Sequence, residues 1–344
     1  MVTKFLSRQS ITPAGKQRGL TLIEFLIASA LGLIIVAALT QLFADFTKTN
    51  REMAKTNSQV ENARFAIQLL RSDIVHAGYW GAHVPDFDNL MFPDDPNDVP
   101  TLTPDPCLPW ASWPDDLDSL IGIPVQATTG SPTTNCDSVV TGELAADGTD
   151  VLVVRHAETC AAGDANCAAD TKGVLYFQAS NCLGEIEALP KPYQIEDPNS
   201  LYNYRERDCL PTNLAEKRRF IQNIYFIKNN SNGIPSLYRS EYGLSGAGAL
   251  EQLTAQELVP GVERFRVELG RDNESETGAP VDYSTKVDWQ DKKVWHVAVN
   301  RGDGIPEDFV HCTTANTGDC TFADLTNVVA VKLYILARAD EASP

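Results

Sequence analysis

The chain has 344 residues, with 46 acidic against 28 basic side chains and a net charge of −18 at neutral pH. Nucleic-acid binding depends on neutralising phosphates with lysine and arginine, so this charge balance argues against a nucleic-acid-binding protein. Hydrophobic residues make up 43% of the chain, which is an ordinary proportion for a globular protein.

A basic leader precedes a long apolar run at the N-terminus. The cations of the leader are Lys4, Arg8, Lys16 and Arg18, and it contains no acid. Positive charge beside a membrane span stays cytoplasmic, and Leu20–Phe43 has about the 20 residues needed to span a bilayer, so the rest of the chain is predicted to face outward. Within the run lies one charged residue, Glu24. A charge at bilayer depth costs about 2.5–3.5 kcal/mol, so Glu24 is expected to have a functional partner.

Residues Arg18–Phe25 resemble the class III signal of type IV prepilins and pseudopilins. In that family a prepilin peptidase cuts after the glycine, here Gly19, and methylates the new N-terminus, here Leu20. Glutamate is the fifth mature residue of the family, and Glu24 is the fifth residue from Leu20. Phenylalanine usually fills the first mature position, where this chain has leucine. The resemblance implies that Glu24 pairs with the N-terminal ammonium of an adjacent subunit.

Two other interpretations of the N-terminus have weaker support. An ordinary secretory signal has an apolar region of about 7–15 residues before its cleavage site, whereas apolar sequence here continues well past Ala28–Ser29–Ala30. A plain membrane anchor would require neither Gly19 nor Glu24.

One long helix is predicted from Leu20 to about His76, because this stretch contains one glycine and no proline. The second half of the helix has apolar residues at alternating spacings of three and four, which predicts one buried face. Those residues are Val60, Ala63, Ile67, Leu70 and Ile74. The opposite face is predicted to carry Arg51, Glu52, Lys55, Glu61, Arg64, Arg71 and Asp73. The helix is expected to end near Gly78, because glycine is favoured at helix ends.

All eight cysteines lie beyond the apolar run, and an even number in an oxidising compartment predicts disulfides. Eight cysteines allow on the order of a hundred connectivities, so the sequence leaves the pairing open. Pairing between neighbours is the simplest choice: Cys107–Cys136, Cys160–Cys167, Cys182–Cys209 and Cys312–Cys320. The tightest pair has six residues between its members, which is wider than the spacing of structural zinc ligands. We therefore expect no metal and no cofactor.

The segment from Pro85 to Pro132 is rich in proline, aspartate and serine and is predicted to form long loops with a few short elements. Strands are predicted over Val151–Arg155, Val174–Gln178, Phe220–Lys228, Ser236–Arg239, Val262–Leu269, Val294–Asn300 and Asn327–Ala337. In Val262–Leu269, apolar and charged residues alternate, as in a strand with one buried face. The predicted fold class is α+β, type IV pilin-like, with the long N-terminal helix packed on a mainly antiparallel β-sheet head.

These patterns divide the chain into four expected parts. Residues 1–19 form the leader peptide, and residues 20–44 the half of the helix that lies in the membrane or fibre core. Residues 45–80 form the amphipathic half, and residues 81–344 an extracytoplasmic head with disulfides. Removal of the leader takes away four cations and lowers the net charge from −18 to −22.

Three later segments resemble the PilW family of minor pilins: Ala77–Gly81, Glu257–Glu263 and Asn327–Arg338. The resemblance implies a low-abundance pilin that primes type IV pilus assembly, sits at the pilus tip, and serves adhesion and twitching motility. Its implied partners are other minor pilins, the major pilin, the prepilin peptidase, the inner-membrane assembly platform, an adhesin-like tip protein and membrane lipid. Chains of this family usually have a further strand after the arginine that Arg338 matches, which leaves closure of the last sheet open.

The alternative from the same family is a J-type minor pseudopilin of a type II secretion system, which shares the signal, the helix and the sheet head. An anchored periplasmic enzyme would draw on His76, His83, His156, His296 and His311. However, H-E-x-x-H and G-x-S-x-G patterns are absent, so we expect no enzyme. The acidic turns at Asp94–Asp98 and Asn300–Asp308 lack EF-hand spacing and are interpreted as solvated loops. Aromatic residues at Trp110, Trp113 and Tyr202–Tyr204 suit either a contact surface or a small core.

Overall fold

The computed structural model describes residues 19–113, 117–140, 148–165, 167–197, 199–200, 202–291, 294–313, 318 and 320–339. The predicted leader, apart from Gly19, lies outside these residues, as does the end of the chain after Ala339. Two compact units, Met1–Lys55 and Thr56–Pro344, are described separately.

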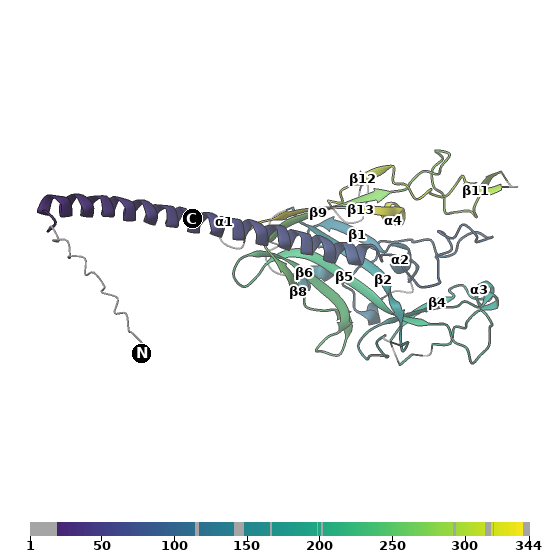
Figure 1. Cartoon of the computed structure of the whole chain (residues 1–344). Coiled ribbons are helices and arrows are strands. Elements are labelled where there is room, and N and C mark those ends of the chain that lie inside the picture. Colours follow the sequence, from purple (N-terminus) through teal and green to yellow (C-terminus); the bar gives the residue numbers. More distant parts are fainter. Residues whose placement is uncertain are drawn as a thin grey trace, which may run out of the picture. The chain divides into compact units, whose positions relative to one another are not determined.

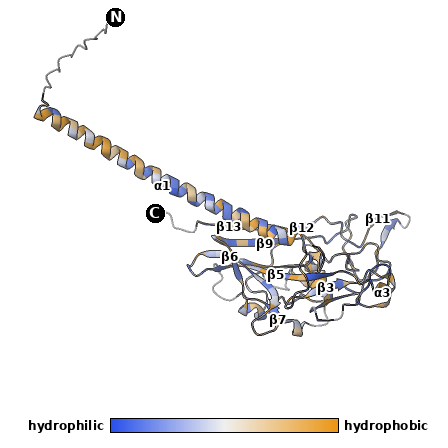
Figure 2. Cartoon of the chain, turned by 60° about the horizontal axis from the view of Figure 1, so that its bottom comes forward, coloured by the Kyte–Doolittle hydropathy of each residue, from blue (hydrophilic) through white to orange (hydrophobic). Residues whose placement is uncertain are grey.

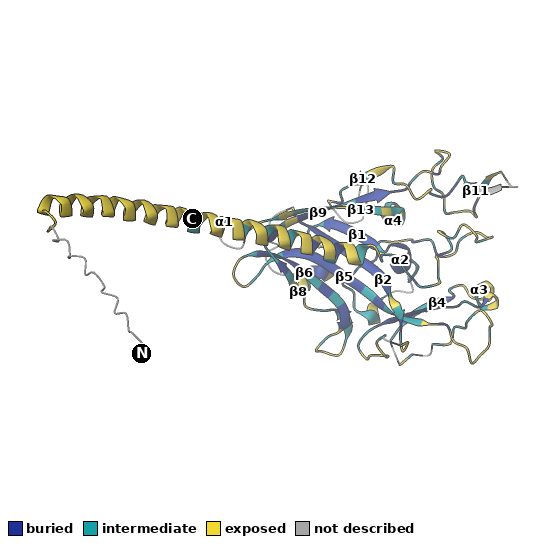
Figure 3. Cartoon of the chain, in the orientation of Figure 1, coloured by how far each residue is buried: buried dark blue, intermediate teal, exposed yellow. Residues whose placement is uncertain are grey.

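The described part of the first unit consists almost entirely of helix. It holds the N-terminal part of α1 (Leu22–Ile74), the one helix among the described residues that is long and apolar enough to span a membrane. Its apolar side chains are exposed all round, with 71% of Leu33 and 72% of Phe43 accessible (Figures 2 and 3). Such a surface is unfavourable in water, so this part of α1 requires lipid or neighbouring apolar helices around it.

The second unit begins with the C-terminal part of α1 and continues into a mainly β head (Figure 1). Its shorter helices are η1 (Trp110–Ser112), α2 (Leu117–Gly122), η2 (Thr134–Ser138), α3 (Leu183–Ala188) and α4 (Phe322–Thr326). The first strands are β1 (Val125–Thr129), β2 (Asp150–Ala161), β3 (Tyr176–Ala179), β4 (Tyr193–Glu196), β5 (Lys217–Asn229), β6 (Pro235–Leu244) and β7 (Leu250–Gln252). They are followed by β8 (Gln256–Pro260), β9 (Val262–Arg271), β10 (Trp289–Asp291), β11 (Val294–Ala298), β12 (Asp308–Val310) and β13 (Val328–Ala337).

All the strand pairs are antiparallel, which confirms the predicted α+β class with an antiparallel head. The largest sheet has eight strands and is built around β5, which pairs with β2, β3 and β6. A second sheet has the order β12-β9-β13, and β10 pairs with β11. Every predicted strand overlaps a strand of the structure, and the described residues of segment 85–132 contain only η1, α2 and β1.

Strand β2 is buried on both faces and separates two cores. Leu152 and Val154 face the core that also contains Ala66 and Leu70 of α1. Val151 and Val153, which alternate with them, face a second core beneath the Cys107–Cys136 disulfide. The eight-stranded sheet is therefore sandwiched between α1 with the β9 sheet on one face and a loop layer on the other.

The loop layer is the proline-rich segment around Pro104 and Pro106. Proline has no backbone N–H, so Pro104 and Pro106 can offer the sheet only their carbonyl groups. Two glutamines of the sheet supply the donors: Gln126 Nε2 donates to the Pro104 carbonyl at 3.0 Å, and Gln222 Nε2 donates to the Pro106 carbonyl at 2.7 Å. Both side chains are buried, so these bonds fix a segment that has no ladder of its own.

The structure contains four disulfides, and they join all eight cysteines in neighbouring pairs. The pairs are Cys107–Cys136, Cys160–Cys167, Cys182–Cys209 and Cys312–Cys320, with Cα separations between 5.0 and 5.7 Å. These are the pairs that local pairing selects, and they fasten loops rather than join distant strands.

Helix α1 ends at Ile74, close to the predicted position. Gly78 follows with a φ of +75°, a conformation that suits glycine, and its N–H donates to the Arg155 carbonyl at 3.0 Å. This bond ties the end of the helix to β2.

The buried face of α1 differs from the predicted one. Val60 and Ile67 are 46% and 44% exposed, whereas Ala66 and Leu70 are fully buried. The stripe that faces the head runs through Asn62, Ala66, Leu70 and Asp73, and its polar ends bond to the head. Leu70 is buried as predicted, and Ile74 packs against the same core. The prediction was wrong in including Val60 and Ile67, in omitting Ala66, and in placing Asp73 on the opposite face.

Two alanine substitutions test this orientation of α1, in which Leu70 is buried and Ile67 is not. We expect Leu70→Ala to lower the free energy of unfolding by about 2–5 kcal/mol, because it removes a fully buried side chain. Ile67→Ala should lower it by about 1 kcal/mol or less, because the Ile67 side chain is already half exposed. Denaturant unfolding of the detergent-solubilised chain, followed by circular dichroism, measures both values. Equal costs would contradict the observed orientation of α1.

Candidate assembly site and helix anchor

The expected cleavage site lies in the short extended segment before α1. Apart from the two neighbouring residues, no described atom lies within 4 Å of the position that a Cβ would occupy on Gly19, and Leu20 is 80% exposed. The described residues therefore leave the bond between them accessible and leave room for a side chain at position 19.

Glu24 forms a capping box with Thr21 at the start of α1. The Thr21 backbone N–H and hydroxyl donate to Glu24 Oε2 at 2.9 and 2.8 Å, and the Glu24 N–H donates to the Thr21 hydroxyl at 3.4 Å. Sequence analysis missed this arrangement, although threonine followed three residues later by glutamate is its signature. Glu24 therefore has a local role in starting the helix, besides any role between subunits.

The capping box leaves part of the carboxylate available. Both donors from Thr21 go to Oε2, and Glu24 is exposed within the described chain. A carboxylate has about four acceptor positions, so Oε1 can accept from a cation while Oε2 remains on Thr21. Capping and pairing with an ammonium are therefore compatible.

A second carboxylate of α1, Asp73, anchors the helix to the sheet. It accepts hydrogen bonds from His156 Nε2 on β2 at 2.9 Å and from Asn223 Nδ2 and the Tyr225 hydroxyl on β5, both at 3.0 Å. Only 12% of the Asp73 side chain is exposed. Three donors from two adjacent strands thus replace the water that this carboxylate loses.

The hydrogen bonds of His156 require its charged form. Nε2 donates to Asp73, and Nδ1 lies 2.9 Å from the Ala157 carbonyl, which can only accept. Both ring nitrogens must carry hydrogen to make both bonds, and this defines an imidazolium. Burial lowers the pKa of His156, but the bonds to Asp73 and Ala157 outweigh it and raise the pKa overall. Burial raises the pKa of Asp73, but the bonds from His156 and Asn223 outweigh it and lower that pKa.

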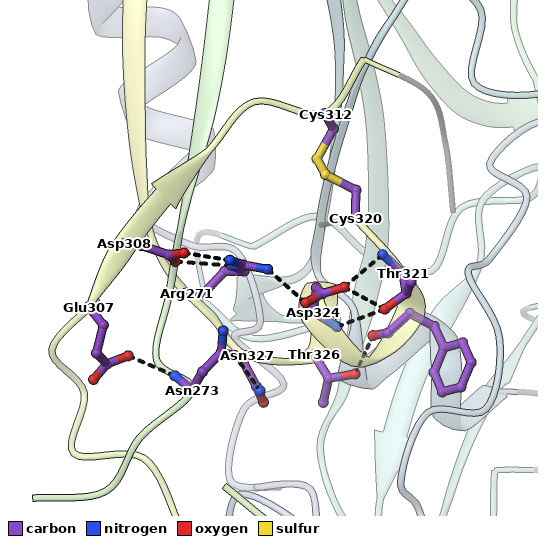
Figure 4. Close-up of polar contacts among 11 residues, drawn as sticks. Arg271, Asn273, Glu307, Asp308, Cys312, Cys320, Thr321, Asp324, Thr326 and Asn327 are labelled. Atoms are coloured by element: carbon purple, nitrogen blue, oxygen red, sulfur yellow. Dashed lines mark hydrogen bonds and ion pairs between the residues drawn. A yellow bond between two sulfur atoms is a disulfide. The ribbon is translucent and has the colours of Figure 1, made fainter. Parts of the chain in front are cut away.

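Arg271 forms a comparable junction in the C-terminal part of the head (Figure 4). Its guanidinium binds both carboxylate oxygens of Asp308 on β12, and Nη1 donates to Asp324 of α4 at 2.7 Å. Asp324 also forms a capping box with Thr321, beside the Cys312–Cys320 disulfide. This network fixes α4 and hence the start of β13.

The histidines considered as catalytic candidates do not form a nucleophilic site in the described residues. Cys160, near His156 in sequence, is bonded to Cys167. Burial lowers the pKa of His83 to about 4, so this half-buried side chain is neutral. His311 Nε2 bonds to the buried Asp150 carboxylate at 2.9 and 3.0 Å and links β2 to the segment before Cys312. The side chain of His296 lies outside the described residues.

In the two acidic turns, aspartate side chains hold loop segments together by accepting hydrogen bonds from backbone N–H groups. Asp98 is 5% exposed and accepts from the N–H groups of Asp86 and Phe87 at 2.6 and 3.1 Å. Asp272 accepts from the N–H groups of Asp303 and Gly304 at 3.3 and 2.5 Å. Asp272, Asp303 and Glu307 have oxygens within 4.8 Å of one another, but the backbone donors already account for the position of Asp272.

The aromatic residues of the loops contribute to a core. Trp110 and Trp113 pack against the cluster that contains Trp80 and Phe220. The Tyr202 hydroxyl donates to the Glu196 carbonyl at 2.6 Å, and the Tyr204 hydroxyl donates to the Lys191 carbonyl at 3.0 Å. The small core is therefore supported for Trp110 and Trp113, whereas Tyr202 and Tyr204 hold loop carbonyls outside that cluster.

Comparison with protein families gives two matches. Residues 15–40 match the prokaryotic N-terminal methylation motif, and residues 224–344 match the Type IV Pilus-assembly protein W family. No curated protein and no solved structure was found to match the chain. The two matches confirm the resemblance at the N-terminus and in the last third of the chain, where Glu257–Glu263 and Asn327–Arg338 lie. Both families are structural components of pili rather than enzymes.

The ion pair between His156 and Asp73 predicts that the free energy of unfolding depends on pH. The raised pKa of His156 contributes stability that is fully present below its unfolded pKa, about 6.5, and is lost as pH rises through the folded pKa. His156→Gln retains a donor without the charge and should be less stable than the natural chain by on the order of 1 kcal/mol at pH 6. We expect this difference to shrink as the pH is raised.

The lowered pKa of Asp73 acts at the other end, because its contribution is lost only as pH falls below about 4. His83, whose pKa is lowered by burial, is common to both proteins, so its contribution largely cancels in the difference. Denaturant unfolding at several pH values measures it, and a difference that is constant from pH 5.5 to about 8.5 would show that His156 does not titrate as described.

Proposed function

We propose that this chain is a minor pilin that helps to initiate type IV pilus assembly and sits at or near the pilus tip with other minor pilins. One combination of observations carries the proposal. A methylation motif, with Gly19, Leu20 and Glu24 at the offsets of a prepilin, lies on an exposed apolar helix, and the last third of the chain matches a pilus-assembly family.

The apolar surface of α1 occupies two environments in succession, first lipid and then the helices of other subunits. Before assembly it holds the subunit in the inner membrane as a single span, with the head in the periplasm. During assembly the same exposed side chains pack against helices of other subunits, so the span can leave lipid without entering water. The acidic head remains soluble throughout.

Glu24 provides the specificity of this transfer. Cleavage after Gly19 and methylation of Leu20 create an ammonium at the end of the chain, and the ammonium of one subunit pairs with Glu24 of its neighbour. In an apolar fibre core an unpaired carboxylate is penalised, so the pair sets the axial register of each new subunit.

The partners follow from the same steps. The prepilin peptidase acts on Gly19 and Leu20, the inner-membrane platform receives the processed subunit, and the other minor pilins and the major pilin surround α1. An adhesin-like protein occupies the tip beside the head. The family match favours this assignment over the secretion-system alternative, because the matched description is of pilus assembly.

Three variants separate the two roles of Glu24. Glu24→Gln keeps an acceptor for the Thr21 cap but removes the charge, Glu24→Ala removes both, and Thr21→Val removes the capping hydroxyl but keeps the charge. We expect both Glu24 variants to reduce incorporation into sheared pili about tenfold or more, because one partner of a buried ion pair is lost. Thr21→Val should be incorporated nearly normally.

The readouts are the amount of this chain in sheared pili and the number of pili per cell, with membrane insertion of each variant verified by fractionation. Normal incorporation of Glu24→Gln together with failure of Thr21→Val would contradict the pairing mechanism. That result would leave Glu24 with the capping role alone.

A further inference from the structure

Among the described residues, strand β13 lies at the edge of its sheet. It is a ten-residue strand that pairs along its length with β9, and no other strand pairs with it among the described residues. A long edge of this kind is a template for another chain, and natural proteins usually cover, shorten or charge such edges.

The direction of the backbone groups of β13 follows from a bond on the far side of β9. The Val267 N–H donates to Asp150 Oδ2 at 2.7 Å, away from β13. Val267 is opposite Leu333, so these two residues form a non-hydrogen-bonded pair. The N–H and C=O of Leu333 therefore point to the open edge, and by alternation so do those of Val331 and Ile335. No partner for these groups is found among the described residues.

The two ends of the edge are fixed in place. At one end, the Asp272 N–H donates to the Asn327 carbonyl at 2.9 Å, immediately before β13. Figure 4 shows the Asn327 side chain bonded to Asn273, near the Arg271 network. At the other end, Gln59 of α1 donates to the Ala337 carbonyl at 2.6 Å, and the Arg338 N–H donates to the Gly261 carbonyl. The open stretch between them is thus held extended, which lowers the entropy cost of adding a strand.

The outward side chains beside this edge are apolar and basic. Tyr334 and Leu336 are 52% and 53% exposed and alternate with core-facing residues. The cations on this face are Arg264, Arg266, Lys332 and Arg338, and the acid among them, Glu268, is engaged by Arg266 and Tyr334. The surplus of positive charge contrasts with the net charge of −18 for the chain.

We propose that the open edge of β13 binds an extended acidic segment of another protein, which adds as a further strand to the β12-β9-β13 sheet. The Val331, Leu333 and Ile335 backbone groups supply the main-chain bonds. Alternating acidic side chains of the incoming strand lie near Arg264, Lys332 and Arg338, and its apolar side chains cover Tyr334 and Leu336. A second copy of this chain is a poorer occupant, because pairing two β13 strands brings like charges together.

A pair of synthetic peptides tests the proposal on the full chain in detergent micelles. One peptide alternates valine and glutamate, and the other alternates valine and lysine. Hydrogen–deuterium exchange, resolved to single amides, should show fast exchange at Val331, Leu333 and Ile335 in the free protein. The acidic peptide should slow exchange at these amides about tenfold or more and the basic peptide should not, while Lys332 and Tyr334, bonded to β9, are slow throughout.

A charge-reversed variant tests the stated chemistry. Arg264→Glu should weaken binding of the acidic peptide about two- to fivefold, whereas Arg64→Glu, an equal change on the exposed face of α1, should leave it unchanged. Protection of the three edge amides in the free, dilute protein would overturn the proposal, as would protection by neither peptide or equally by both. Protection that grows with protein concentration would assign the edge to a second copy and would also overturn it.

Discussion

A carboxylate that leaves water has to find donors elsewhere, and Asp73 shows how the head of this protein meets that requirement. Its partners come from β2 and β5, the central strands of the largest sheet, and one of them is an imidazolium. Removing a partner from such a group costs about 3–5 kcal/mol, because the remaining charge stays buried. The contact therefore fixes the rotation of α1, and with it which side chains the helix gives to the core and which it leaves exposed.

The same requirement applies to Glu24, but there the partner is expected in another subunit, so it bears on assembly and not on folding of the head. Among the described residues Glu24 finds only Thr21, and its carboxylate lies in a run of exposed apolar side chains. The described part of the chain thus gives Asp73 a cationic partner and gives Glu24 none. We infer that assembly supplies the missing cation, as the proposed function describes.

Much of this architecture could be predicted from the sequence, because its signals are local. The prepilin signal depends on offsets within eight residues, the long helix on the absence of proline, and the strands on alternation. What the sequence did not reveal depends on distant partners. Asp73 is predicted to be an exposed charge because its partners His156, Asn223 and Tyr225 are distant in the sequence. The strands β7, β10 and β12 have too few residues to show an alternating pattern. The Thr21–Glu24 cap has a local signature and could have been predicted, but Glu24 was interpreted only as the glutamate of the prepilin signal.

The central claim is that this chain is processed and assembled as a low-abundance pilin, and mass spectrometry of its N-terminus in sheared pili tests it most directly. The account predicts a chain that begins with methylated Leu20 and is present in an amount far below that of the major pilin. An intact leader in cells that contain the peptidase, or cleavage near Ala30, would contradict it. Either result would leave a membrane-anchored or secreted acidic protein as the remaining interpretation of this chain.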